Sequence, residues 1–294
     1  MYHFMAAGLG VLIALMITVN SRFAAALGNL PSSLLVHLTG LALVSLILLI
    51  RREEKTGITV PFYLRLGGFV GVSLVLFNNI CFLALGASLT ISLGIVGQTL
   101  GGQIVDATGF LGMKKHPFLP AKLPGWALVL AGALLMTGGS PGNWPYMVLA
   151  FVTGALVMLA SVLNAQLGRR MGLFRATRIN YIAGLITVGV LLLIFQTSLD
   201  SYRNLPEVPL LIILGGGTLG VLVTTGMNFV IPRIPAVYST ILIFLGQVSA
   251  GLLIDIAMTR SVSWPKTAGA AIILLGLFQK SRVDRRVRLR DAQA

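Results

Sequence analysis

Ten long apolar runs, separated by short gaps that contain charged residues, Pro or Gly, limit what this chain can fold into more than any other feature. A run such as LALVSLILLI at residues 41–50 contains no charged residue at all. The hydrocarbon core of a bilayer is about 30 Å thick, and a helix needs about 20 apolar residues to cross it. We therefore predict an all-α membrane protein with ten transmembrane helices, at roughly residues 3–27, 31–50, 62–86, 89–112, 122–139, 145–168, 174–196, 208–230, 236–258 and 264–280.

The composition excludes a soluble protein. Of the 294 residues, 56% are hydrophobic and 10% are charged, whereas a soluble domain carries about 25% charged residues. The net charge of +14 does not indicate nucleic acid as a partner, because Lys and Arg lie in the short gaps and in the C-terminal tail. Cys81 is the only cysteine and the three histidines are scattered, so we predict no disulfide, no metal site and no cofactor. The first run has no positive residue before Arg22, which favours a first transmembrane helix over a cleaved signal peptide.

The two halves of the chain repeat each other at residues 1–140 and 145–280, and a basic tail follows at 281–294. An offset of 144 or 149 matches Gly10, Asn20, Gly28, Gly40, Leu41, Gly67, Gly71, Asn79, Gln98, Gly102 and Asp106 to Gly154, Asn164, Gly172, Gly184, Leu185, Gly216, Gly220, Asn228, Gln247, Gly251 and Asp255. An odd number of spans per repeat makes the second copy enter the membrane from the opposite side, as in the inverted repeats of secondary transporters. We therefore predict two inverted five-helix repeats.

Positive charge is concentrated on one side of the predicted helices. Eighteen of the 22 Lys and Arg residues lie in or next to the gaps after even-numbered helices and in the tail, and the others are Arg22, Arg203, Arg260 and Lys266. By the positive-inside rule, we predict a multi-pass membrane protein with both termini in the cytoplasm. We expect the tail from Lys280, KSRVDRRVRLRDAQA, to be solvated and to lie against anionic lipid.

The motif Gln-x-x-x-Gly-x-x-x-Asp occurs inside an apolar run of each half, as QTLGGQIVD at residues 98–106 and QVSAGLLID at residues 247–255. Its spacing places the three side chains on one face of a helix. Polar side chains at membrane depth are costly unless they face a protein interior or a water-filled cavity. Gln98 and Gln247 fall near the middle of their helices, where the substrate site of an inverted-repeat transporter lies. We interpret both as cavity-lining residues that bind substrate.

Two interpretations stay open for the aspartates of this motif. Asp106 lies on the cytoplasmic side of the centre of its helix, and Asp255 lies nearer the outer end. Each carboxylate either caps a neighbouring helix or reaches interfacial water, an interpretation that fits Asp255 better than Asp106. Alternatively, the two aspartates are gating or coupling groups that guard opposite mouths of the cavity, one in each repeat.

Three further pairs of equivalent positions carry polar groups inside the apolar runs, namely Asn20 and Asn164, Asn79 and Asn228, and His37 and Tyr181. The asparagines either form interhelical hydrogen bonds, each worth about 0.6 kcal/mol, or line the cavity and bind substrate. His37 and Tyr181 differ in chemistry at matched positions, so they break the symmetry of the repeats. A single His on an apolar helix is more often a packing residue than a proton carrier, and both residues remain candidates for substrate binding.

Enzyme motifs are absent from the apolar runs. Neither Gly-x-Ser-x-Gly nor His-Glu-x-x-His occurs there, and no Gly-rich segment follows a strand or carries a phosphate-binding Lys. The spacing of four in Gly67 and Gly71, or in Gly216 and Gly220, is typical of close helix packing in lipid. We therefore predict no catalytic residue and no enzymatic activity.

Four segments resemble the YdcZ-like inner-membrane exporters of the drug/metabolite transporter superfamily: VNSRFAAALG at 19–28, LNAQLGRRMG at 163–172, GQTLGGQIVDATGFLG at 97–112 and LGQVSAGLLID at 245–255. The resemblance covers about residues 4–280. It implies a pair of five-helix units, usually separate chains and here fused into one. The second copy departs from the first because Asp255-Ile-Ala-Met stands where the first has Asp106-Ala-Thr-Gly, so the two carboxylates need not be equivalent.

Together these features predict a secondary transporter, in the direction of export, that moves a small neutral or cationic metabolite or drug-like solute by alternating access. The solute charge follows from the buried polar groups, which are amides, hydroxyls, a His and acids, while nearly every Lys and Arg belongs to a loop or the tail. The predicted partners are the small-molecule substrate and membrane lipid, and a homodimer is left open. The alternatives are a non-transporting membrane protein, such as a lipid scramblase or an assembly subunit, and an intramembrane enzyme.

Overall fold

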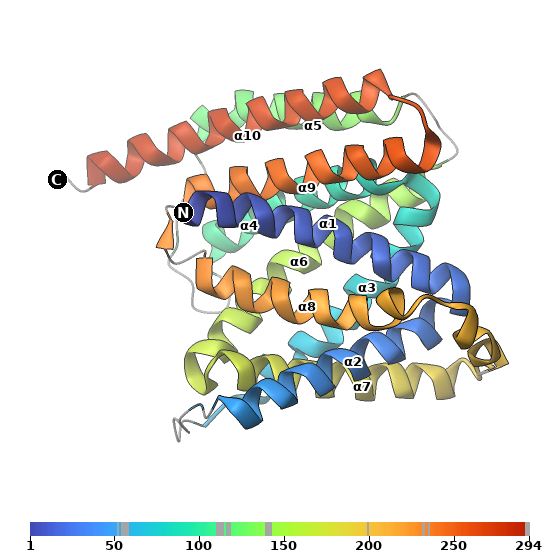
Figure 1. The fold of residues 1–294 in the computed structure, drawn as a ribbon. Coiled ribbons are helices and arrows are strands. Elements are labelled where there is room, and N and C mark those ends of the chain that lie inside the picture. The colour runs from blue at the N-terminus through green and yellow to red at the C-terminus, as the bar shows by residue number, and fades with distance from the viewer. Residues whose placement is uncertain are drawn as a thin grey trace. The chain divides into compact units, whose positions relative to one another are not determined.

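A computed structural model (Figure 1) describes residues 1–51, 53, 59–109, 115, 119–138, 143–198, 200–230, 233–234 and 236–291. These residues form helices and short connections without a strand, so the predicted all-α class is confirmed. The α-helices are α1 (Tyr2–Leu27), α2 (Asn29–Ile50), α3 (Gly67–Leu85), α4 (Ala87–Thr108), α5 (Leu123–Met136), α6 (Trp144–Met171), α7 (Leu173–Ile194), α8 (Leu210–Val230), α9 (Ala236–Thr259) and α10 (Trp264–Asp291). Short 3₁₀-helices occur at η1 (Phe62–Leu66), η3 (Pro120–Lys122) and η5 (Asp200–Glu207).

Large apolar side chains cover the outer surface of several helices. Leu49, Leu193 and Leu211 are 79%, 79% and 81% exposed. Soluble proteins rarely expose extended apolar surface of this kind, but in a bilayer the same side chains contact lipid. Within the described ranges, eight helices are long and apolar enough to cross a membrane. The chain is therefore a multi-pass membrane protein.

Three abrupt connections between helices depend on a glycine in the left-handed region. Gly28 (φ 90°), Gly86 (φ 80°) and Gly172 (φ 88°) each stand alone between two α-helices. A residue with a Cβ adopts this conformation only at a cost. Gly28 and Gly172 are equivalent positions, and their N–H groups donate to the carbonyl oxygens of Ala24 (2.8 Å) and Gly168 (2.9 Å). The same turn therefore joins α1 to α2 and α6 to α7.

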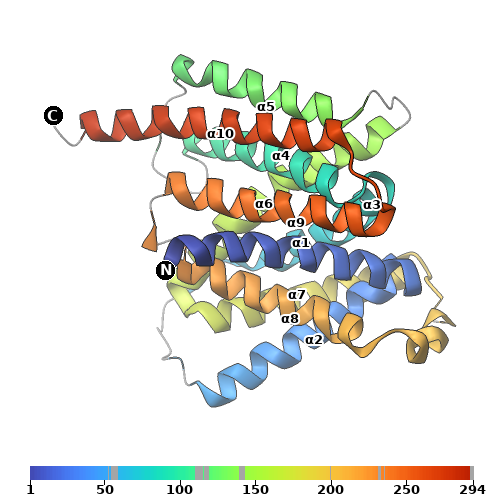
Figure 2. The same ribbon diagram turned by 45° about the horizontal axis from the view of Figure 1, so that its top comes forward.

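The helices form two compact units, each with segments from both halves of the sequence. Unit 1 comprises Met1–Ala14, Leu85–Ala155 and Phe229–Ala294. Within it α5 packs along α10 and α4 packs against α9, and the two views agree that α5 and α10 run side by side (Figures 1 and 2). This approach requires glycine, because a Cβ on Gly132 would lie 2.6 Å from the carbonyl oxygen of Gly269.

Unit 1 also contains a matched pair of glycine contacts. Gly10 of α1 lies directly against the carbonyl oxygen of Ile243 in α9, and Gly154 of α6 lies against the carbonyl oxygen of Gly94 in α4. The offset of 144 relates Gly10 to Gly154, and the offset of 149 relates Gly94 to Ile243. The sequence repeat is therefore also a repeat of helix contacts.

Unit 2 comprises Leu15–Ala84 and Leu156–Asn228, and its central contact is the packing of α2 against α7. The segment η5 was not predicted, and it packs on an apolar cluster whose buried members are Phe23, Leu27 and Val36. The cluster is extended by Leu35, Tyr202, Leu205, Val208, Ile212 and Ile213.

The helix boundaries differ from the predicted spans mainly at α5 and α10. With 14 residues, α5 is about 21 Å long, which is shorter than the predicted span and than the hydrocarbon core. The predicted tail continues α10 as a helix as far as Asp291. Lys280 is only 6% exposed, so the expectation that it is solvated was wrong. Whether every one of these helices crosses the membrane stays a prediction.

Candidate functional site

Within unit 2, His37 of α2 and Tyr181 of α7 meet where the two helices pack against each other. The His37 ring lies against Gly184, and the Tyr181 ring lies against Gly40. The ring centroids are 5.9 Å apart with an interplanar angle of 65°, so one ring meets the other edge-on. The offset of 144 relates His37 to Tyr181 and Gly40 to Gly184. The aromatic ring on each helix therefore fills the space beside the glycine of the other helix.

The hydrogen bonds of these two side chains determine which atoms remain available to a solute. Nδ1 of His37 donates to the carbonyl oxygen of Ser33 at 2.8 Å, since a carbonyl oxygen can only accept. In the neutral ring Nε2 is then an acceptor. The Tyr181 hydroxyl donates to the carbonyl oxygen of Gly217 at 3.2 Å.

The equivalent residues Asn20 and Asn164 each lie against a glycine, but only one of them has an amide partner. Oδ1 of Asn164 lies beside Gly67 and accepts a hydrogen bond from Nδ2 of Asn180 at 2.6 Å. Oδ1 of Asn20 lies beside Gly216, and it is buried without a hydrogen-bond partner in the described part of the chain. The offset of 144 puts Val36 where the second half has Asn180, which explains the missing partner.

Two acceptors are therefore left open inside unit 2. Oδ1 of Asn180 is also buried without a partner, like Oδ1 of Asn20. A buried polar atom without a hydrogen bond costs about 1–3 kcal/mol. Few buried polar groups in native structures lack a partner, and a bound water or ligand is one explanation for those that do. Both atoms would accept a hydrogen bond from a solute that carries N–H or O–H groups.

Asn79 is by contrast fully engaged with its neighbours in unit 2. Its Oδ1 accepts from Ser21 Oγ at 3.2 Å, and its Nδ2 donates to Asn29 Oδ1 at 2.8 Å. Asn29 in turn donates to the carbonyl oxygen of Leu76 at 3.0 Å. This network ties the turn between α1 and α2 to α3, so we interpret Asn79 as an interhelical link. The side chain of its equivalent, Asn228, lies outside the described residues.

Gln98 and Gln247 belong to unit 1, on the packed helices α4 and α9. Gln247 is buried and Gln98 is half-buried. Their backbone nitrogens lie close to the glycines of the matched contacts, Gln98 near Gly154 and Gln247 near Gly10. Therefore α6 packs on α4 beside Gln98, and α1 packs on α9 at the equivalent point beside Gln247.

Asp255 caps the first turn of α4. Its carboxylate accepts from the backbone nitrogens of Ala87 (2.7 Å) and Ser88 (3.3 Å) and from the Ser88 hydroxyl. Lys266 of α10 forms an ion pair with it at 2.9 Å. The carboxylate also lies beside Gly86, the residue with positive φ that precedes α4. We expected Asp255 to lie near water, but it is only 8% exposed, and its arrangement matches the capping interpretation.

Asp106 lacks the sequence features that hold Asp255. The offset of 149 relates Ser88 to Val237, which has no hydroxyl, and Lys266 to Pro117, which has no charge. Asp106 itself is half-buried in the last turns of α4. The side chain of Val237 and residue Pro117 lie outside the described ranges. The two aspartates are thus unequal in their chemical neighbours, even though the motif repeats.

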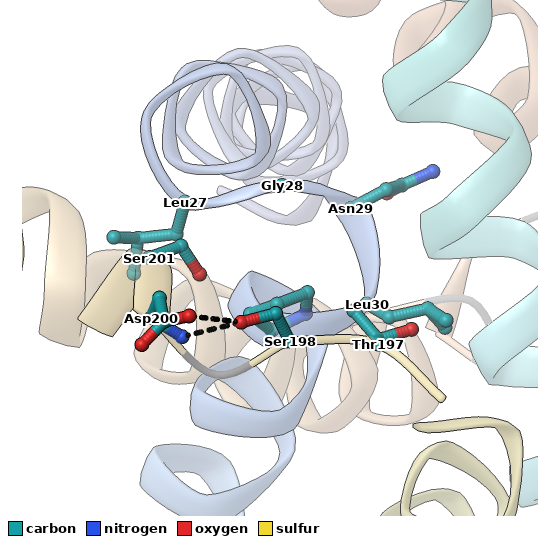
Figure 3. A pocket seen from close by; sticks show the side chains of 9 residues that line it. Leu27, Gly28, Asn29, Leu30, Thr197, Ser198, Asp200 and Ser201 are labelled. Carbon is teal, nitrogen blue, oxygen red and sulfur yellow. Dashed lines mark hydrogen bonds between the residues drawn. The ribbon is translucent and has the colours of Figure 1, made fainter. Parts of the chain in front are cut away.

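A pocket of about 510 Å³ opens at the turn between α1 and α2 in unit 2 (Figure 3). It is lined by Leu27–Pro31 and by Thr197, Ser198, Asp200 and Ser201. The Ser198 hydroxyl donates to the Asp200 carboxylate at 2.7 Å on its rim. None of the predicted site residues lines this pocket, and hydropathy could not have found it because it lies beyond the apolar runs.

Sequence reasoning also missed Glu53, which caps α7. Its two carboxylate oxygens accept from the backbone nitrogens of Phe174 and Arg175, each at 3.0 Å. Glu53 lies beside Gly172, the residue before α7. The equivalent glycine in the first repeat, Gly28, precedes α2, and no side chain caps α2 there. An acidic residue far from the helix in sequence gives no local capping pattern, so no signal in the sequence could have identified it.

Comparison with known proteins identifies both halves of the chain. The model of a protein family described as "Putative inner membrane exporter, YdcZ" matches residues 1–135 and again residues 145–279. A solved structure described as "Crystal structure of protein" covers 97% of both chains with 18% identity and a TM-score of 0.58, which shows a shared fold. No curated protein matches the chain.

Proposed function

Because the chain belongs to the YdcZ family of inner-membrane exporters and carries the family domain twice, we propose that it exports a small neutral or cationic solute by alternating access. The two domains are inverted five-helix repeats, and together they cross the membrane ten times. The charge bias of the loops and the matched glycine contacts of Gly10 and Gly154 support this arrangement.

The observation that carries the proposal is the pair of open acceptors in unit 2. Asn20 Oδ1 and Asn180 Oδ1 both need a donor, and neutral His37 adds an acceptor nitrogen. No Lys or Arg is buried among the described residues of this unit. A solute that donates hydrogen bonds, with or without a positive charge, fits this lining. An anion would face acceptor atoms without a compensating cation.

Asp106 is the better candidate for a coupling role. Asp255 is already occupied by two backbone N–H groups, a hydroxyl and an ion pair. Protonation of Asp255 during a transport cycle would break all of these contacts. Asp106 has neither the matching hydroxyl nor the matching lysine, so it can change partners at lower cost. Gln98 and Gln247 remain candidates for substrate contact.

The test uses the Asn20→Ala variant and a panel of solutes. Solutes that raise the melting temperature of the purified protein should be neutral or cationic and carry N–H or O–H groups. Asn20→Ala should bind them about tenfold more weakly or worse, because one hydrogen bond to the solute is lost. The unliganded variant should be as stable as the native protein or more stable, since an unsatisfied buried oxygen is removed.

Asn204→Ala is the matched control, because Asn204 is an exposed amide on η5. It should leave both solute affinity and melting temperature unchanged. A less stable Asn20→Ala variant with native solute affinity would mean that Asn20 only holds helices together. Stabilisation by polyanions in preference to cations would contradict the proposed solute class.

A further inference from the structure

Two buried lysines meet in unit 1 where η3 and α5 lie beside α10. Lys122 is 7% exposed and Lys280 is 6% exposed. Nζ of Lys122 forms an ion pair with Asp284 at 2.5 Å and donates to Oε1 of Gln103 at 3.4 Å. Nζ of Lys280 lies 3.3 Å from the centre of the Trp126 ring. We call these five residues the α5–α10 basic cluster.

Hydrogen-bond donors outnumber acceptors in this cluster. Among the residues that the structure describes, Nε2 of Gln103 and Nε1 of Trp126 are both buried without a hydrogen-bond partner, and Trp126 is 6% exposed. The carboxylate of Asp284 is already paired with Lys122. Lys280 has the face of an aromatic ring beside it, and Asp284, although close enough to act on it electrostatically, forms its ion pair with Lys122. A buried ammonium and two buried N–H groups each carry a desolvation cost that an acceptor would remove.

The missing partner must therefore supply several acceptor oxygens and negative charge. A phosphate group does both, and Lys is a common ligand of phosphate. This cluster differs chemically from the site in unit 2. The buried atoms without a partner in unit 2 are hydrogen-bond acceptors, whereas those in the cluster are donors that lie beside lysines. A neutral or cationic solute that fits unit 2 does not fit this cluster.

The position of the cluster along α10 indicates the source of the phosphate. The apolar run of α10 ends at Phe278, and Lys280, Arg282 and Arg286 follow it. Leu123 and Phe278, beside the cluster in sequence, are 55% and 43% exposed. The polar cluster and exposed apolar side chains thus adjoin where the apolar run of α10 gives way to basic residues, as the headgroup and acyl chain of a lipid adjoin. Basic pockets between transmembrane helices bind anionic headgroups in this way.

We propose that the α5–α10 basic cluster is a binding site for the phosphate group of an anionic membrane lipid. The phosphate oxygens accept from Lys280 Nζ, Trp126 Nε1 and Gln103 Nε2, and the acyl chains lie along Leu123 and Phe278. The proposal does not rest on the proposed transport function, because the cluster contains none of the substrate or coupling candidates.

The experiment measures the melting temperature of the full-length protein in a zwitterionic detergent, with three additives titrated separately. Phosphatidylglycerol should stabilise the protein in a saturable way, and phosphatidylcholine or inorganic phosphate at the same concentration should not. Trp126→Phe keeps an aromatic ring for Lys280 and removes the N–H donor together with the five-membered ring of the indole, so the apparent affinity for phosphatidylglycerol should fall about tenfold. Lys280→Gln should weaken it further.

Arg286→Gln is the control, because it removes an exposed positive charge from the same helix. Its affinity for phosphatidylglycerol should stay within about twofold of the native value if the buried cluster, and not the general charge of α10, binds the lipid. Equal stabilisation by phosphatidylcholine would overturn the proposal. A Trp126→Phe variant that binds phosphatidylglycerol with native affinity would also overturn it. The Trp126→Phe result alone decides between these outcomes if Lys280→Gln fails to fold. Equal stabilisation by inorganic phosphate would identify a site for free anions and overturn the assignment to lipid.

Discussion

At the scale of single residues, equivalent positions in the two repeats have diverged into different roles. Asp255 is held by α4 and by Lys266, whereas Asp106 has Val237 and Pro117 at the matching positions. Asn164 has Asn180 as its partner, whereas Asn20 faces a valine position and keeps an open oxygen.

Substitution of the two aspartates separates these roles. Asp255→Asn should lower the free energy of unfolding by about 1–3 kcal/mol, because it weakens the buried cap on Ala87 and Ser88 and removes the ion pair of the half-buried Lys266. Transport per folded molecule should stay close to native. Asp106→Asn should leave the stability nearly unchanged and abolish or uncouple transport.

The measurements are thermal unfolding of the purified variants and solute flux in proteoliposomes between about pH 6 and pH 8, a range in which a coupling carboxylate would have to exchange its proton. Native flux in Asp106→Asn across that range would remove Asp106 from the mechanism. An Asp255→Asn variant as stable as the native protein would contradict the capping role.

At the scale of helices, the sequence predicts position well and contacts poorly. The length of an apolar run follows from bilayer thickness, so the predicted spans agree with α1 to α4 and α6 to α9 within a few residues. The cap on α7 by Glu53, the link from Ser21 to Asn79 and the burial of Lys122 depend on residues distant in sequence. Local patterns contain no information about such partners, and η5 lies in a polar stretch that hydropathy leaves undefined.

Glycine contacts test the packing of α6 on α4. A Cβ at Gly154 would collide with the backbone carbonyl of Gly94, whereas a Cβ at Gly168 of the same helix meets no atom within 4 Å. Gly154→Ala should therefore destabilise the protein by about 1–3 kcal/mol. Gly168→Ala should be neutral or stabilise it by up to about 1 kcal/mol, because alanine favours the helix.

Thermal unfolding of both variants in the same detergent provides the comparison. If the two substitutions shift the melting temperature equally, the close contact between α4 and α6 does not exist in the membrane protein. The equivalent variant Gly10→Ala should behave like Gly154→Ala, because its Cβ would collide with the carbonyl oxygen of Ile243.

At the scale of the whole molecule, the proposed mechanism depends on the second repeat being inverted relative to the first. The tandem match of the family to residues 1–135 and 145–279 shows two copies, and the loop charges predict that the two copies have opposite orientations. Inversion places equivalent loops on opposite sides of the membrane. The segments between the second and third helices of each repeat contain Thr59 and Asn204, and both residues are exposed.

The most direct test of this account labels single cysteines at these two positions with a membrane-impermeant thiol reagent, in a Cys81→Ser background that leaves no other thiol. Asn204→Cys should be labelled in intact spheroplasts, because its loop faces outward. Thr59→Cys should be labelled only after the membrane is made permeable, because its loop faces the cytoplasm. Labelling of both cysteines from the same side would show that the repeats are parallel, and alternating access through an inverted pair would then be excluded.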